Sequence, residues 1–160
     1  MNLRNLETLD SDLHIRAATL NDVPAILALQ SQVPTAAHWS ETQYNALFTA
    51  EAVPRIALVL ERANALVGFI IARAAVAEWE IENIVVASSN RKRGLGRLLL
   101  SHLLNSAKAQ NAESVFLEVR ESNAAARGLY EKAGFVKTGS RRLYYSCPPE
   151  DAILYQLSLL

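Results

Sequence analysis

The 160-residue sequence has little sulfur: it contains one cysteine, Cys147, and one methionine. A lone thiol cannot form an internal disulfide, which argues against a disulfide-stabilised secreted domain. The three histidines, His14, His38 and His102, are too far apart in the sequence to predict a metal site. Nothing near Cys147 would activate it as a nucleophile. We therefore expect neither a bound metal nor a covalent intermediate on cysteine.

Long apolar runs and an excess of one charge are also lacking. No apolar run approaches the roughly 18 residues that a membrane span needs. Residues 1–15, with Glu7, Asp10 and Asp12, lack the apolar core of a secretory signal. Sixteen basic residues balance sixteen acidic ones, so no overall field favours a nucleic-acid backbone or an anionic membrane. These absences predict a cytoplasmic protein that binds neither nucleic acid nor membrane.

What the sequence does have is enough apolar surface for one core. Hydrophobic residues make up 51% of the chain and charged residues 20%, without a repeat, a linker or a low-complexity segment. We expect a single domain over residues 1–160. Hydrophobic periodicity predicts the element order βαα, βββ, α, β, α, ββ, which is a mixed α/β (α+β) domain with helices packed on a largely antiparallel sheet.

The expected elements have recognisable boundaries. Ser40 and Gln43 have the spacing of a capping box, with Trp39 and Tyr44 placed to form a hydrophobic staple across it. Strands are expected over residues 13–19, 55–61, 65–76, 78–88, 114–119, about 135–145 and 151–157. Helices are expected over residues 19–32, from residue 40, after Gly94, and between Asn123 and Gly134.

A glycine-rich turn, RKRGLG, precedes the helix that starts after Gly94. A helix start exposes unpaired backbone N–H groups, and glycine lets an anion approach them closely. The turn therefore indicates an anion site, although a solvated basic turn would have the same sequence. Two common phosphate loops are excluded, because Leu99 replaces the third glycine of G-x-G-x-x-G and no G-K-[ST] follows. The residues that would surround the anion are Arg91, Lys92, Arg93, Gly94, Leu95, Gly96 and Arg97.

Following the apolar strand NIVVAS, this turn resembles the acetyl-CoA pyrophosphate loop of the Gcn5-related N-acetyltransferase (GNAT) superfamily. The later stretch LEVRESNAAARGLYEKAGF, with GSRRLYY and EDAIL, resembles RimI-type enzymes, which acetylate the N-terminal alanine of a small-subunit ribosomal protein. HWSE near residue 40 resembles a PWSE element of the same family. The motifs cover about residues 80–157. The resemblance implies the GNAT fold, a twisted, largely antiparallel sheet of about seven strands flanked by about four helices.

Acetyl transfer to an amine needs a neutral amine, stabilisation of the developing oxyanion and a proton for the departing thiolate. The resemblance implies acetyl-CoA as the co-substrate, Glu118 as the base and Tyr130 as the acid that protonates the coenzyme sulfur. From the residues alone, Glu118 could instead be an edge carboxylate paired with Arg120 or another cation, and Tyr130 a core aromatic. Glu80 and Glu82, on one face of the preceding strand, are alternative bases.

The resemblance implies further cofactor contacts outside the glycine turn. The backbone of Ile84, Val85 and Val86 is expected along the acetyl and pantetheine groups, with an N–H near Val86 as the oxyanion donor. Plain burial in a strand would explain these apolar residues equally well. Asn123 is expected to contact the cofactor too, and its role as a helix N-cap follows from the sequence itself.

The acceptor is expected near a basic, aromatic segment that matches RRNYY of the family: Arg141, Arg142, Tyr144 and Tyr145. An exposed β-hairpin would have the same composition. The following SCPPEDA is shorter than the loop that RimI-type chains often carry, and residues 36–38 replace the usual proline before Trp39. These departures bear on the acceptor more than on acetyl transfer.

The acceptor therefore stays open among primary amines. A protein N-terminal α-amine is the first expectation, such as that of a small-subunit ribosomal protein. Lysine side chains, polyamines and other small amines are alternatives. A non-catalytic acyl-CoA-binding module is a further one, against which the presence of both Glu118 and Tyr130 argues.

Overall fold

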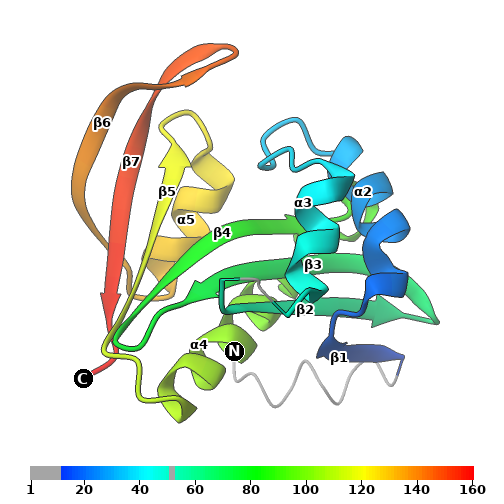
Figure 1. Cartoon of the computed structure of the whole chain (residues 1–160). Helices are drawn as coiled ribbons and strands as arrows, with labels where there is room; N and C mark the ends of the chain where they lie inside the picture. Colours follow the sequence, from blue (N-terminus) through cyan, green and yellow to red (C-terminus); the bar gives the residue numbers. More distant parts are fainter. Residues whose placement is uncertain (1–11, 51–52) are drawn as a thin grey trace.

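The computed structural model describes residues 12–50 and 53–160 (Figure 1). The mixed α/β fold with a seven-stranded sheet is confirmed, and the elements follow the expected order. The strands are β1 (Leu13–Ala17), β2 (Arg55–Arg62), β3 (Ala65–Ala74), β4 (Glu78–Val86), β5 (Ser114–Arg120), β6 (Val136–Ser146) and β7 (Pro149–Ser158). The helices are α2 (Val23–Ser31), α3 (Glu41–Asn45), α4 (Leu95–Ala109) and α5 (Ala124–Lys132), with short 3-10 turns η1 (Leu20–Asp22), η2 (Ala46–Phe48) and η3 (Ser88–Asn90).

The strands form one sheet in the order β1-β2-β3-β4-β5-β7-β6. Neighbouring strands are antiparallel except β4 and β5, which are parallel. The expected meander is β2-β3-β4. α4 connects β4 to β5, because parallel neighbours need a crossover connection. At the edge away from β1, β6 and β7 form a long hairpin that extends beyond the rest of the sheet (Figure 1).

Helices cover both faces of the sheet. Phe69 of β3 contacts Tyr44 of α3 edge-on, with ring centroids 6.2 Å apart. A Cβ built on the neighbouring Gly68 would lie 3.1 Å from Cδ1 of Leu99 in α4. Successive strand residues point to opposite faces, so α3 and α4 lie on opposite sides of β3. α5 lies beside α4, because its Leu129 is 3.4 Å from a Cβ built on Gly96.

Packing of α4 fixes the position of the glycine turn that precedes it. Each fully buried leucine stabilises the fold by about 1.5–3 kcal/mol relative to an exposed one, so this helix is held firmly against the sheet. Its buried residues are Leu95, Leu98, Leu99, Leu100, Leu103 and Ala107.

The start of α3 is the capping box expected from the sequence. The Ser40 N–H donates to Gln43 Oε1 at 2.8 Å, and the Gln43 N–H donates to Ser40 Oγ at 3.2 Å. The rings of Trp39 and Tyr44 lie 5.4 Å apart, as expected for the staple. These contacts set the direction in which residues 35–39 approach the sheet.

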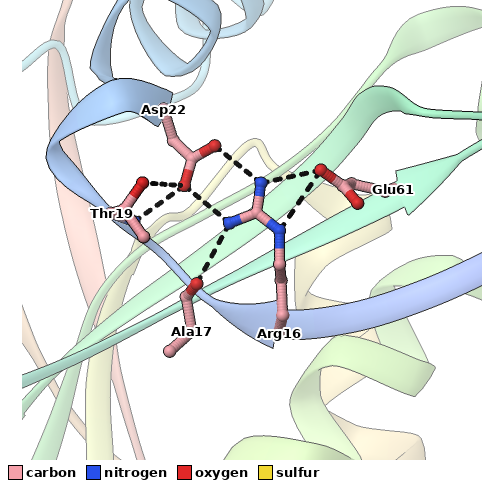
Figure 2. A network of polar contacts seen from close by, with 5 residues as sticks. All are labelled: Arg16, Ala17, Thr19, Asp22 and Glu61. Atoms are coloured by element: carbon pink, nitrogen blue, oxygen red, sulfur yellow. Dashed lines mark hydrogen bonds and ion pairs between the residues drawn. The ribbon is translucent and has the colours of Figure 1, made fainter.

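An ion-pair network joins β1, the start of the α2 region and β2 (Figure 2). The Arg16 guanidinium donates to both carboxylate oxygens of Asp22 at 2.8 Å and to Oε1 of Glu61 at 2.7 Å. Asp22 also accepts from the Thr19 N–H at 2.7 Å, which closes the first turn. The hydrogen bonds from Arg16 hold the pKa of Asp22 at about 2, below its ordinary value of 3.8.

Candidate active site

β4 and β5 separate part-way along their length. They are paired from Glu78↔Ser114 to Ile81↔Leu117, and beyond that point the two strands diverge (Figure 1). A cavity of about 280 Å³ opens at the separation, lined by β4, β5, α5, residues 35–38 and Tyr145. From Glu82 onward, the β4 edge that faces the cavity has no strand partner among the described residues, and at its end the Val86 carbonyl accepts a hydrogen bond from Arg91 Nε at 3.4 Å.

A β-bulge in β4 lies at this separation. Ile71 of β3 pairs with Asn83 and Ala72 with Ile81, so Glu82 is the extra residue. A bulge bends its strand and increases the local twist, which is consistent with β4 turning away from β5. The alternation of the sequence did not reveal this bulge, because an extra residue becomes visible only when the partner strand is known.

Glu118 is the first residue of β5 beyond its last pair with β4. Its carboxylate lines the cavity, and its side chain is 15% exposed. Arg141 of β6 lies with its Nε 3.1 Å from Glu118 Oε1, so the cation paired with this carboxylate is Arg141 rather than Arg120. The hydroxyl of Tyr144 also donates a hydrogen bond to Glu118, which raises the pKa of Tyr144.

The alternative bases on β4 are each held by an arginine. Arg55 donates to both oxygens of Glu82, at 2.6 and 3.1 Å, and Arg73 donates to Glu80 at 2.5 Å. Burial raises the pKa of Glu80, against the opposing effect of Arg73. The bidentate pair with Arg55 engages both acceptor atoms of Glu82, which leaves that carboxylate less available to an amine.

Tyr130 is a buried aromatic that also borders the cavity. It is 4% exposed and packs against Phe135 and Tyr155, with ring centroids 5.7 and 6.3 Å away, yet it also lines the cavity. No hydrogen bond to its hydroxyl is found within residues 12–50 and 53–160. Burial raises the pKa of Tyr130 well above its usual value, so the hydroxyl keeps its proton at neutral pH.

The glycine turn leads into a start of α4 that no side chain caps. Gly94 is the N-cap of α4 with a φ of +77°, and no side chain caps the helix. The first helical bond runs from the Leu98 N–H to the Gly94 carbonyl at 3.0 Å, which leaves the preceding N–H groups at a bare helix start. Arg91, Lys92, Arg93 and Arg97 are exposed around it, whereas the Leu95 side chain is buried and can offer only its backbone.

The remaining expected residues divide between core and cavity. Ile84 lines the cavity, Val85 is buried in the sheet and Val86 is half-buried. Asn123 lines the cavity and caps α5, as predicted, by accepting the Ala126 N–H at 3.2 Å.

Comparison with known proteins identifies the family. Residues 23–135 match the acetyltransferase (GNAT) family. The chain belongs to this family. It is 33% identical over 147 residues to the ribosomal protein bS18-alanine N-acetyltransferase of Salmonella typhimurium, covering 91% of this chain and 97% of that one. It is 43% identical to the N-alpha-acetyltransferase RimI of Mycobacterium tuberculosis over 75 residues, 47% of this chain and 46% of that one.

Solved acetyltransferases share the fold. The ribosomal-protein-S18-alanine N-acetyltransferase of Escherichia coli is 30% identical with a TM-score of 0.81, covering 92% of this chain and 94% of that one. A Salmonella typhimurium acetyltransferase, solved with its cofactor acetyl-CoA, has a TM-score of 0.78 at 21% identity, over 93% of this chain and 95% of that one. This chain is therefore an acetyl-CoA-dependent N-acetyltransferase of the GNAT family and is similar to RimI-type enzymes.

The candidate site of this acetyltransferase joins the cavity to the start of α4 through the end of β4. Gly94 is in the left-handed conformation, the start of α4 has no side-chain cap, and the β4 edge without a β5 partner lies beside the cavity. Among the described residues, no group of three or more histidine, cysteine, aspartate or glutamate side chains could hold a metal ion. Within the same residues, no helix is both long and apolar enough to cross a membrane.

The sequence interpretation missed two features that shape the site. Arg120 stacks on the ring of Tyr145 with its guanidinium carbon 4.2 Å from the ring centroid, and it donates to the carbonyls of Cys147 and Pro148 at 3.2 Å. It thereby joins the end of β5 to the β6–β7 turn. The second feature is Asn83, a buried polar residue in β4. Cys147 itself is exposed.

Proposed function

We propose that this acetyltransferase acts on the N-terminal α-amine of a protein, with Glu118 as general base and Tyr130 as general acid. One observation carries the proposal: Glu118 of β5 and Tyr130 of α5 line the same cavity where β4 and β5 separate. The relatives are named for acetylating an alanine of ribosomal protein bS18 and, in one case, for N-alpha-acetylation. Those names favour a protein α-amine, such as that of a small-subunit ribosomal protein, as the acceptor.

The two residues manage the two protons of the reaction. Bound acetyl-CoA supplies an acetyl group activated as a thioester. Glu118 accepts the proton that the acceptor amine loses when its nitrogen forms the new amide bond. Tyr130 donates its phenolic proton to the coenzyme sulfur as the carbon–sulfur bond breaks, and its raised pKa ensures that the proton is present.

The proposed cofactor contacts follow the free edge of β4 into the start of α4. The β4 backbone beside the cavity accepts the pantetheine arm, an N–H near Val86 stabilises the developing oxyanion, and the glycine turn binds the pyrophosphate. The full set is Ile84, Val85, Val86, Arg91, Lys92, Arg93, Gly94, Leu95, Gly96, Arg97 and Asn123.

A comparison of acceptors tests the proposal. The enzyme and acetyl-CoA are mixed with a peptide that begins with alanine, the same peptide blocked at its N-terminus but containing a lysine, or spermidine. Thiol release and product mass are recorded. We expect kcat/KM to be highest for the free N-terminus, with the acetyl group on the α-amine. If the blocked peptide or spermidine reacts faster, the acceptor is a lysine side chain or a polyamine and not a protein N-terminus. Cofactor binding without thiol release on any amine would indicate a binding module.

A further inference from the structure

β6 contains an irregular segment opposite the proposed base. Arg141 of β6 pairs with Ala152 of β7, and Tyr145 pairs with Glu150. Residues 142–144 therefore face the single residue Asp151. A bulge of this kind bends the strand and redirects its side chains.

The centre of the bulge is a strained residue held by a carboxylate. Leu143 has a φ of +49°, in the left-handed region that residues with a side chain rarely adopt. The residue is 63% exposed, so burial does not account for the conformation. The Leu143 N–H donates to Oδ1 of Asp151 at 2.8 Å. Such strain persists where specific contacts fix the backbone, and the hydrogen bond to Asp151 is one.

The bulge brings two side chains to one carboxylate. In a regular strand, Arg141 and Tyr144 would point to opposite faces because side chains alternate. Here Arg141 Nε lies 3.1 Å from Oε1 of Glu118, and interaction with the same carboxylate raises the pKa of Tyr144. The Arg141 guanidinium also lies 5.6 Å from the Tyr144 ring centroid, as expected for side chains on one side of the strand.

We propose that Asp151 is a positioning residue of the acetyl-transfer site. Its carboxylate fixes the β6 bulge, and the bulge sets Arg141 and Tyr144 on Glu118, so that the base is aimed at the acceptor amine. The inference rests on the proposed role of Glu118 as the base. Asp151 acts through its neighbours and takes no proton in the reaction.

The test compares Asp151→Ala with Asp151→Asn, which keeps an oxygen acceptor for the Leu143 N–H. Lys137→Ala, at an exposed position of β6 away from the bulge, is the control. Two measurements are independent of activity: the hydrogen-exchange rate of the Leu143 amide, and the ultraviolet titration of Tyr144, isolated by difference against Tyr144→Phe. The kinetic measurements are kcat and both KM values with an alanine-initiated peptide.

We expect Asp151→Ala to speed exchange of the Leu143 amide and to lower the pKa of Tyr144 toward its ordinary value, because the hydrogen bond to Glu118 is lost. kcat should fall about tenfold to 100-fold, as small displacements of catalytic groups do, with KM for acetyl-CoA within about twofold. Asp151→Asn should restore most of kcat, and Lys137→Ala should match the wild type.

Two results would overturn the proposal. Unchanged Leu143 exchange in Asp151→Ala would mean that the carboxylate does not fix the bulge. Faster exchange with undiminished kcat would mean that the bulge does not serve the reaction. Full activity of Glu118→Gln would show that Glu118 is not the base. The proposed function would then fail, and Asp151 would have no base to position. This outcome is distinct from the two above because it is measured on Glu118 and not on Asp151.

Discussion

Asn83 of β4 forms two hydrogen bonds with the main chain of Ala37: its Nδ2 donates to the carbonyl at 3.0 Å, and its Oδ1 accepts from the N–H at 3.3 Å. Asn83 is 5% exposed. Its Nδ2 also donates to the Tyr44 hydroxyl at 3.2 Å, and that hydroxyl donates to Gln30 Oε1 at 2.5 Å. Residues 35–38, which line the cavity, are thereby attached to the bulged part of β4.

Asn83→Ala should lower the free energy of unfolding and weaken acceptor binding. Removing the amide takes away both side-chain hydrogen bonds to Ala37 and leaves the buried Tyr44 hydroxyl without its donor, at about 0.5–1.5 kcal/mol for each hydrogen bond lost. We expect KM for the peptide to rise more than KM for acetyl-CoA, because residues 35–38 border the cavity. Urea unfolding and steady-state kinetics measure both effects. Asn105→Ala, at an exposed position of α4, is the control, and equal stability of the two variants would contradict the prediction.

Asn83 illustrates which parts of the molecule the sequence predicts. Helix starts depend on neighbouring residues, so the Ser40 capping box and the Asn123 cap were predicted and are confirmed. The strands and helices were predicted from periodicity, whereas the GNAT fold itself was inferred from resemblance. Asn83 lies at a buried position of β4 between Ile81 and Val85, but its hydrogen-bond partners Ala37 and Tyr44 are distant in the sequence, so its role was missed.

The sequence also did not predict which charged residues pair with one another. Arg120 stands two positions from Glu118 on the same strand, but it binds the carbonyls of the β6–β7 turn, and its ion pair is with Glu150. The cation beside Glu118 is Arg141, which the hairpin returns from a distant part of the sequence. Ion pairs between distant strands depend on the strand register and on bulges, and these cannot be predicted from a single sequence.

The network around Arg16 should make stability depend on pH in the acid range. The pKa of Asp22 is about 2 in the folded protein, against an ordinary value of 3.8. Its stabilising contribution is therefore complete above about pH 5 and is lost as the pH falls toward 2, because the unfolded chain takes up the proton first. The contribution is about 2 kcal/mol.

Asp22→Asn should reduce the free energy of unfolding by about that amount at pH 7 and flatten its decline between about pH 5 and 2. Asp12→Asn, at an exposed position, should change stability at pH 7 by less than about 0.5 kcal/mol. Urea unfolding at a series of pH values provides the comparison. A profile for Asp22→Asn parallel to that of the wild type would refute the assignment.

Two glycine-to-alanine substitutions should have opposite effects. Gly94 has a φ of +77°, so Gly94→Ala strains the turn by about 1–2 kcal/mol and should raise KM for acetyl-CoA as the start of α4 shifts. Gly128 lies within α5, and a Cβ built there meets nothing within 4 Å. Gly128→Ala should therefore stabilise the protein by about 0.5–1 kcal/mol and leave KM for acetyl-CoA unchanged. Thermal unfolding measures the stability of each variant, and steady-state kinetics measure its KM for acetyl-CoA. Destabilisation by both variants would contradict the interpretation that only Gly94 needs a left-handed conformation.

Glu118→Gln should separate the proposed base from its alternatives on β4. The amide keeps the size of the side chain but cannot accept the amine proton, so kcat should fall about 10²–10⁴-fold with little change in KM for acetyl-CoA. Glu82→Gln, which alters a carboxylate already bound to Arg55, should retain most of kcat. If Glu82→Gln instead shows the larger loss of kcat, the base is on β4 and not on β5.

Tyr130→Phe should remove the acid while leaving the core intact. The ring contacts with Phe135 and Tyr155 do not need the hydroxyl, so the melting temperature should stay close to that of the wild type. kcat should fall about 10²–10⁴-fold, because the thiolate then leaves without a proton from the enzyme.

The pH profile provides an independent check on Tyr130. Burial raises its pKa above the ordinary value of 10.0, and the active form is the protonated one. The wild-type kcat should therefore not decline between about pH 8 and 10, because deprotonation of Tyr130 begins only at higher pH. A decline in that range that disappears in Tyr130→Phe would show that the hydroxyl titrates normally, and it would contradict the proposed role of a buried, fully protonated acid.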